Sequence, residues 1–234
     1  MPGLFAASRI LEPSMILGTG CLAASSLDGT RISDALRRTG LQTVLLQPRK
    51  GNRQADLHGV PAVGVHCNWD LRRQAVTAAV AAGTDRLIVD LPLDMELETA
   101  CRSLFELARE VSGLGLGLRT PAGGPLADPE NLGLLLEDLG ALPVTYWHRP
   151  SQAHLLGLED ALWIERLGRY FCGLFLDDVR DGQAGIPPGL GELDLRPTAE
   201  LSARSLDVIL DIDPIPDISL LRVTLDGLAR LGFS

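Results

Sequence analysis

Short apolar runs alternate with longer amphipathic runs along almost the whole of this 234-residue chain. Each apolar run has the length of a strand, and each amphipathic run has the period of a helix that covers a sheet. Such an alternation indicates repeated βα units built around one parallel sheet. The predicted strands cover residues 15–20, 43–48, 62–67, 86–91, 114–120, 144–149, 171–177 and 207–213.

The segments between these strands are predicted to be helices. Asp128-Pro129-Glu130 is the clearest start signal, because it combines an N-cap carboxylate, a proline at the first helical position and an acid in the first turn. The predicted helices cover residues 31–39, 71–82, 95–112, 129–139, 158–167, 197–203 and 218–231, with a short and poorly defined one near 52–57.

Eight βα units leave roughly 29 residues for each unit, which is close to the minimum for a (β/α)8 barrel. An open doubly wound sheet is the alternative, but Gly18-Thr19-Gly20-Cys21 after the first strand lacks the later glycine of a dinucleotide-binding fingerprint. We therefore predict an α/β fold in which residues 1–234 form one domain, a single compact (β/α)8 TIM barrel.

The charge of the chain limits the classes of partner. Thirty acidic and 21 basic side chains give a formal net charge of −9, which argues against binding to nucleic acid or to an anionic membrane. No apolar stretch reaches the roughly 18 residues of a membrane-spanning helix, and the first residues lack the pattern of a secretory signal. The four cysteines form no CxxC pair, which is typical of reduced thiols. These features predict a cytoplasmic protein with a small-molecule ligand and leave the oligomeric state open.

The alternation of side chains along each strand predicts which of them enter the barrel. In residues 114–119 leucine alternates with glycine; the leucines suit the face covered by helices, and the glycines suit the crowded interior. Arg119 is therefore predicted to point inward at the C-terminal end of its strand, where barrel enzymes have their active sites. The same alternation predicts that five more polar side chains point inward, and that Phe175 points inward as a packing residue. The five are Gln47, His66, Asp90, Arg149 and Asp211.

These inward polar residues have two interpretations from the sequence alone. Arg119 and Arg149 either neutralise Asp90 and Asp211 in a closed network of salt bridges, or bind the phosphate or carboxylate group of a small anionic metabolite. In the same way, His66 is either a hydrogen-bonded interior histidine or an acid–base group.

Three segments in the second half of the chain carry a family resemblance. They are Tyr-Trp-His-Arg-Pro-Ser-Gln-Ala at 146–153, Gly-Leu-Phe-Leu-Asp-Asp-Val at 173–179, and Ile-Pro-Pro-Gly-Leu-Gly-Glu-Leu-Asp-Leu at 186–195. In order and spacing they resemble the xylose isomerase-like TIM-barrel family, and the last is similar to its "PPGxGxxD" loop after the seventh strand. That family contains sugar-phosphate isomerases and epimerases and the related AP endonucleases, so the resemblance implies the same barrel and chemistry on a sugar carbon.

The resemblance also implies a metal site that this chain does not reproduce. Members of the family bind divalent metals through carboxylates and histidines at the barrel mouth. The glutamate of strand five falls on Arg119, the aspartate and histidine of strand six fall on Arg149 and Gln152, and the histidine of strand seven falls on Phe175. The histidine that precedes the "PPG" loop is absent.

Two carboxylates of the family pattern are kept, Asp211 on strand eight and Asp178 at the end of the strand-seven motif. An arginine in the place of a metal ligand is a permanent cation with no acceptor atom, so two such replacements are expected to abolish tight metal binding. The candidate ligand-binding set is Gln47, His66, Asp90, Arg119, Arg149, Gln152, Asp178 and Asp211.

The sequence predicts a degenerate sugar-phosphate isomerase/epimerase-like barrel that acts as a binding scaffold or sensor for a small anionic metabolite. It predicts no cofactor and assigns no catalytic residue. The alternative is an active isomerase or epimerase. It is either metal-independent, with His66 and Asp211 as the acid–base pair, or dependent on Mn²⁺, Zn²⁺, Co²⁺ or Mg²⁺. The reserve ligands for such a metal are Asp177, His148, His154 and Glu192.

Overall fold

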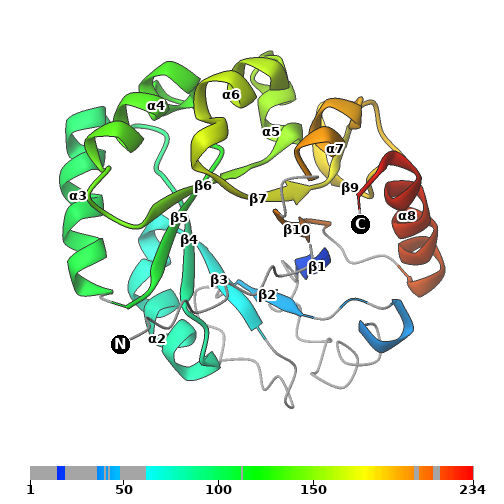
Figure 1. Cartoon of the computed structure of the whole chain (residues 1–234), viewed down its shortest axis with the longest axis horizontal. Helices are drawn as coiled ribbons and strands as arrows, with labels where there is room; N and C mark the ends of the chain where they lie inside the picture. Colours follow the sequence, from blue (N-terminus) through cyan, green and yellow to red (C-terminus); the bar gives the residue numbers. More distant parts are fainter. Residues whose placement is uncertain are drawn as a thin grey trace, which may run out of the picture.

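Parallel strands close into a barrel, as the alternation of runs predicts (Figure 1). The computed structural model of the chain describes residues 15–18, 36–39, 41, 43–47, 62–111, 113–202, 206–212 and 217–233. Around the barrel the strand order is β1-β10-β7-β6-β5-β4-β3-β2, and every neighbouring pair is parallel. The strands are β1 (Met15–Gly18), β2 (Val44–Leu46), β3 (Ala62–Asn68), β4 (Arg86–Asp90), β5 (Gly115–Arg119), β6 (Val144–His148), β7 (Phe171–Leu176) and β10 (Asp207–Leu210).

Helices surround the barrel on its outer side (Figure 1). The Asp128 side chain accepts a hydrogen bond from the backbone N–H of Glu130, so the predicted start signal caps a helix. Within the described residues, no helix is long and apolar enough to cross a membrane. The α-helices are α2 (Arg72–Ala82), α3 (Leu97–Glu110), α4 (Pro129–Asp138), α5 (Pro150–Leu155), α6 (Asp160–Leu167), α7 (Arg196–Ser202) and α8 (Ile218–Leu231); short 3-10 turns are η1 (Trp69–Leu71), η2 (Pro125–Ala127) and η3 (Gly168–Tyr170).

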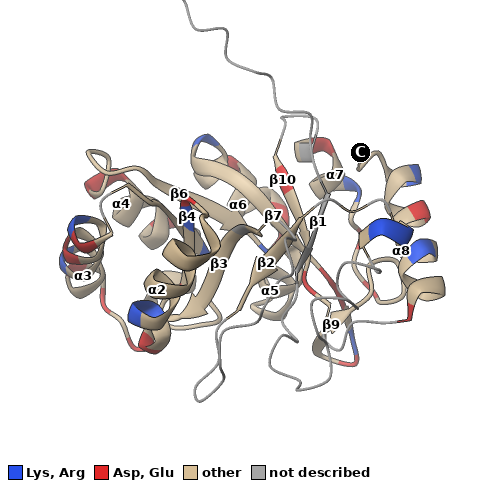
Figure 2. Ribbon diagram, turned by 90° about the horizontal axis from the view of Figure 1, so that it is seen from below, with Lys and Arg blue, Asp and Glu red and all other residues tan. Residues whose placement is uncertain are grey.

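The predicted elements agree with the observed ones over most of the described chain. The helix near 52–57, most of the helix over 31–39 and the ends of three predicted strands lie outside the described residues. Two features after strands were not predicted. One is the helix α5, and the other is an antiparallel hairpin formed by β8 (Asp178–Arg180) and β9 (Gln183–Ile186). In side view both lie at the same end of the barrel (Figure 2).

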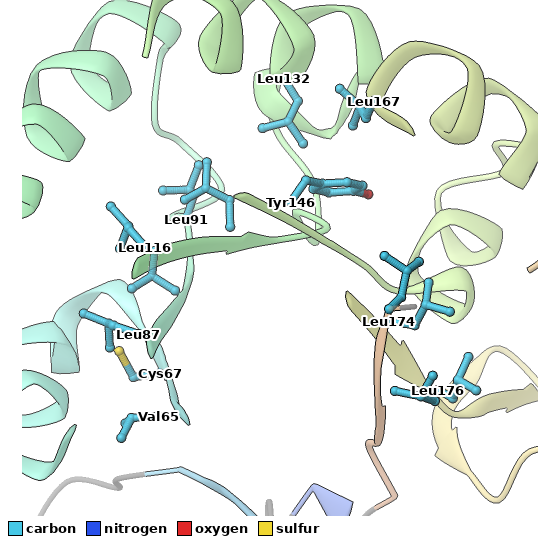
Figure 3. Packing of buried hydrophobic residues seen from close by; sticks show 14 of the residues in the cluster. Val65, Cys67, Leu87, Leu91, Leu116, Leu132, Tyr146, Leu167, Leu174 and Leu176 are labelled. Carbon is cyan, nitrogen blue, oxygen red and sulfur yellow. The ribbon is translucent and has the colours of Figure 1, made fainter. Parts of the chain in front are cut away.

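The outer side of the strands is apolar. Leu116 and Leu174 project from β5 and β7 away from the barrel centre, and helical leucines such as Leu132 and Leu167 face the sheet (Figure 3). All four side chains are almost completely buried. The parity predicted for β5 is therefore confirmed, because its leucines pack against the helices and its glycines face inward.

A compact apolar layer fills the barrel interior. Trp147 is its largest member, and its ring fits because the two strands on either side of β6 carry glycine at this level. A Cβ atom on Gly173 would lie 2.2 Å from the Trp147 ring, and one on Gly117 would lie 2.7 Å from it. Arg86 lies over the same ring at 5.2 Å. The fully buried residues of the layer are Leu45, Ile88, Trp147, Phe175 and Ile209.

Replacing Gly173 by alanine is expected to lower the free energy of unfolding by about 1–3 kcal/mol, because the added methyl group must displace the Trp147 ring. Gly227→Ala is the matched control. This glycine lies within α8, where an added Cβ meets nothing within 4 Å, so the change is expected to raise stability by about 0.5–1 kcal/mol. Urea denaturation of the two variants measures both effects, and equal stability of the pair would contradict the packing described here.

Candidate active site at the barrel mouth

Arg119 occupies the centre of the barrel mouth at the end of β5. Its Nε and Nη2 atoms donate hydrogen bonds of 2.7 and 2.8 Å to the two carboxylate oxygens of Asp90, at the end of β4. Its Nη1 atom donates a bond of 3.0 Å to Asp211, which follows β10. The guanidinium also lies 5.2 Å from the Phe175 ring, so it rests on the apolar layer inside the barrel.

A second arginine extends this network toward β7. The Arg149 Nη2 atom donates a bond of 2.6 Å to Asp177 Oδ2 and lies 3.2 Å from the Asp211 carboxylate. Asp177 is fully buried and also accepts bonds from the Ser151 hydroxyl and, at 2.7 Å, from the backbone N–H of Gly185. Asp211 therefore joins the two arginines, and Asp177 ties the hairpin to the mouth.

His66 completes the network on the side of β3. The Gln47 amide nitrogen lies 2.8 Å from His66 Nδ1, and His66 Nε2 lies 3.0 Å from Asp90 Oδ1. An amide nitrogen is only a donor, so in this arrangement Nδ1 accepts and Nε2 carries the proton that faces Asp90. His66 Nδ1 is thus hydrogen-bonded to Gln47, whereas Nε2 is buried close to Asp90 without forming a hydrogen bond to it.

Burial and the arginines act in opposite directions on the carboxylates. Burial raises the pKa of Asp90, but the Arg119 guanidinium and His66 together hold this pKa well below its ordinary value. Burial also raises the pKa of Asp177, and here the effect of Arg149 is the smaller one, so the pKa stays above its ordinary value. Asp90 is therefore firmly ionised, whereas Asp177 is held less firmly in its charged form.

Two cavities open at this mouth. One of about 350 Å³ has Arg119, Arg149 and the hairpin backbone at Ala184 and Gly185 among its lining residues. The other, of about 630 Å³, shares both arginines and adds Trp69 and Gln152. Seven of the eight predicted ligand-binding residues line one or both cavities, namely Gln47, His66, Asp90, Arg119, Arg149, Gln152 and Asp211.

Asp178, the eighth predicted residue, lines neither cavity. Its carboxylate is fully buried and accepts hydrogen bonds of 2.8 to 3.0 Å from four backbone N–H groups. These groups belong to the adjacent residue and to the Pro-Pro-Gly loop and its continuation. The structure therefore places Asp178 as the anchor of that loop and not at the mouth. The donors are Val179, Gly189, Gly191 and Leu193.

Asp177 is a site residue that the sequence analysis named only as a reserve metal ligand and left out of the candidate ligand-binding set. It has the same parity as Phe175, which was predicted to point inward, so the alternation of the strand carried this signal. The neighbouring Asp178 matched the family motif and was selected in its place. Ser151 and the hairpin backbone carried no comparable signal, because their positions depend on the chain that follows each strand.

The residues at this mouth do not fit a divalent metal. The carboxylate oxygens of Asp90, Asp177 and Asp211 already accept hydrogen bonds from guanidinium nitrogens, and Arg119 stands between two of these carboxylates. A metal ligand must offer a free lone pair, and a guanidinium has none. In the part of the chain that the structure describes, no three histidine, cysteine, aspartate or glutamate side chains are placed to hold one ion.

Comparison with known proteins identifies the fold. No family model and no curated protein sequence matches the chain. The probable 3-DHS dehydratase AsbF of Bacillus anthracis matches with a TM-score of 0.76 at 9% identity, over 92% of this chain and 98% of that one. A xylose isomerase domain containing protein of Salmonella typhimurium matches with 0.73 at 10%, over 97% and 100%. An L-ribulose 3-epimerase matches with 0.69 at 10%, over 94% of each chain. The chain therefore has the fold of the xylose isomerase-like TIM barrels.

Removing the Arg119 cation by Arg119→Gln is expected to lower the free energy of unfolding at neutral pH by about 3–5 kcal/mol, because Asp90 then has no guanidinium partner and Asp211 keeps only Arg149. The pKa of Asp90 is lower in the folded protein than in the unfolded chain, so the pairing stabilises the fold at neutral pH and the stabilisation is lost in acid. The deficit of the variant is therefore expected to shrink as the pH falls below about 4.

The matched control is Arg102→Gln, which breaks an exposed pair with Glu98 on α3. Its expected effect is below about 0.5 kcal/mol. Denaturant titrations across the acid range measure both variants. A deficit for Arg119→Gln that is as small as that of Arg102→Gln would contradict a central role for this guanidinium.

Proposed function

We propose that this barrel binds a small anionic metabolite at its mouth without a divalent metal, as a binding scaffold or sensor with the fold of the sugar-phosphate isomerases and epimerases. The observation that carries the proposal is the position of Arg119. Its guanidinium is bound to Asp90 and to Asp211, so a cation of the chain itself occupies the space between these carboxylates. Such a site keeps charge and hydrogen bonding and has no open coordination position.

The hydrogen-bond inventory of the mouth supports a ligand with one anionic group and several hydroxyl groups. The bonds that Arg149 makes to Asp177 use Nε and Nη2, which leaves the two Nη1 protons to an incoming phosphate or carboxylate oxygen. Gln152 lines the same cavity and can both donate and accept. The three aspartates outnumber the two arginines, so the cluster accepts protons from ligand hydroxyls and disfavours a second anionic group on the ligand.

The alternative of an active isomerase or epimerase has less support from this geometry. A metal-dependent reaction needs ligands that the described mouth does not offer. A metal-independent reaction through His66 and Asp211 needs two groups that can reach a substrate proton. In the described structure, His66 Nδ1 is bonded to Gln47 and Nε2 is buried beside Asp90, so neither ring nitrogen is exposed to a substrate.

Isothermal titration calorimetry with glucuronate, glucose 6-phosphate and glucose tests the proposal. The two anionic sugars are expected to bind with dissociation constants below the millimolar range, and glucose at least about tenfold more weakly, because a charge-assisted bond is lost. Arg149→Gln is expected to remove this preference for the anionic sugars. Addition of EDTA or of Mn²⁺ is expected to leave each dissociation constant unchanged.

The matched control is Arg196→Gln, which removes an exposed arginine that is paired with Asp194 and lines neither cavity of the mouth. It is expected to bind as the unmodified protein does. Two results would overturn the proposal. One is binding that appears only after a divalent metal is added. The other is turnover of a sugar or sugar phosphate that depends on such a metal.

A further inference from the structure

The larger cavity of the mouth, of about 630 Å³, has two sides of different character. On one side the ends of β5 and β6 carry Arg119 and Arg149, which are bound to their aspartates. The other side is formed by residues 68–70 and 91–94, at the ends of the neighbouring strands β3 and β4 (Figure 1). These two segments supply no basic residue to the lining, so this side suits an uncharged part of a ligand.

Trp69, on the uncharged side, has a ring that reaches the cavity. The other two tryptophans of the chain, Trp147 and Trp163, are fully buried, whereas Trp69 is half-buried and lines the larger cavity. The Arg72 guanidinium lies 4.6 Å from the centre of the Trp69 ring, and Arg72 Nη1 donates a bond of 2.9 Å to the Trp69 carbonyl oxygen. These contacts hold the ring in place, so it forms a fixed, flat part of the cavity wall.

Leu93 adds a second apolar side chain to the same side. It follows β4, lines the larger cavity and is 58% exposed. Because β3 and β4 are paired, Leu93 and Trp69 reach the cavity from adjacent strand ends. Both side chains therefore leave apolar surface open to water inside a cavity, and a ligand with one apolar face would cover this surface.

Two side-chain amides border this apolar surface. Asn68 occupies the N-cap position of η1, where an asparagine commonly caps a helix, but its side chain makes no capping bond. It is exposed and lines both cavities, and Gln152 on α5 lines the larger one. Among the described residues neither amide has a hydrogen-bond partner, whereas Arg119 and Arg149 are both bound to aspartates. Each amide can donate and accept, so both suit the hydroxyl groups of a ligand.

Exposed aspartates set the direction in which a ligand lies. Asp70 and Asp94 line the cavity on the side of Trp69. Their carboxylates accept hydrogen bonds from hydroxyl groups and repel an anionic group. Arg149, on the other side, has two Nη1 protons that its bonds to Asp177 do not use. An anionic ligand therefore lies with its charged group toward Arg149 and its hydroxylated part toward Trp69.

We propose that the ligand is a cyclic sugar acid or sugar phosphate whose ring packs on Trp69 and whose anionic group binds Arg149. The amides of Asn68 and Gln152 then bind hydroxyl groups of the ring. A pyranose ring presents C–H groups on one face and hydroxyl groups around its edge, which matches an aromatic surface bordered by amides. An open-chain sugar acid has the same charge but no fixed face. This inference rests on the proposed function, because it needs an anionic ligand at the mouth.

Methyl glucuronide and gluconate are the probes. Each carries one carboxylate and several hydroxyl groups, but only the glycoside is locked as a ring. The glycoside is expected to bind at least about tenfold more tightly in calorimetry at neutral pH, because its face packs on Trp69 and its shape is fixed before binding. Trp69→Leu is expected to reduce this preference to less than about threefold, because leucine offers no flat surface.

Tyr170→Leu is the matched control. Tyr170 is half-buried in the 3-10 turn η3, and Arg169 lies 4.7 Å from the centre of its ring, as Arg72 does over Trp69. It lines neither cavity of the mouth, so this variant is expected to keep the preference for the glycoside. Equal affinity of the unmodified protein for the two probes would overturn the proposal, and so would a preference that survives Trp69→Leu.

Acrylamide quenching of tryptophan fluorescence tests the position of Trp69 without a ligand. Because Trp147 and Trp163 are fully buried, Trp69 is expected to account for most of the quenching, and Trp69→Leu is expected to remove it. Methyl glucuronide is expected to protect the unmodified protein from acrylamide more than gluconate does at equal concentration. Quenching that Trp69→Leu leaves unchanged would overturn the inference, whether or not a sugar binds.

The outcomes distinguish this inference from the proposed function. Quenching that depends on Trp69, together with equal binding of methyl glucuronide and gluconate, would overturn this inference alone. Failure of methyl glucuronide, glucuronate and glucose 6-phosphate to bind would overturn both proposals.

Discussion

The guanidinium group of Arg119 joins carboxylates that reach the mouth from separate parts of the barrel. Asp90 ends the neighbouring strand β4, whereas Asp211 follows β10, which two further strands, β7 and β6, separate from β5. Two carboxylates in a partly buried site repel each other by several kcal/mol unless a cation stands between them. A planar fork suits this task, because it donates along fixed directions from one rigid group. The carboxylates of the mouth are therefore held together by a charge that belongs to the chain itself.

The apolar layer beneath the mouth gives this cation its place. Gly117 and Gly173 lack side chains, so the barrel can accommodate the whole Trp147 ring at their level. Phe175 packs against Trp147 at 5.8 Å and supports the Arg119 guanidinium from below at 5.2 Å. The glycines on the strands thus determine where the large Trp147 ring fits. The Trp147 and Phe175 rings in turn determine the level along the barrel at which the charged side chains lie. Packing and electrostatics in this barrel are consequences of the same strand parity.

Strand parity is also the reason why so much could be predicted from the sequence. One inward residue per strand fixes its neighbours, so the strands, the interior position of Phe175 and six of the seven candidates that line the mouth follow from alternation, whereas Gln152 follows from the family resemblance. Features beyond the strand ends obey other rules. The β8–β9 hairpin turns at Asp181-Gly182, both with positive φ, which is a recognised hairpin signal, but its strands are too short to alternate clearly. The role of Asp178 depends on a loop that folds back over it.

A cation that is part of the chain limits the ways in which ligand binding at the mouth can be regulated. A bound metal exchanges with solvent and offers open coordination positions, whereas a guanidinium stays charged at physiological pH and accepts nothing. The charge and hydrogen bonding of such a site can then change only through groups that gain or lose a proton, or through the ligand. Hydrogen bonds from Asp160 through His148, Tyr146 and Thr120 end at the backbone N–H of Arg149, so buried groups on the outer side of the barrel help to position this arginine. Under the proposed function, the fixed charge of the two arginines makes binding at this mouth independent of the supply of a metal ion.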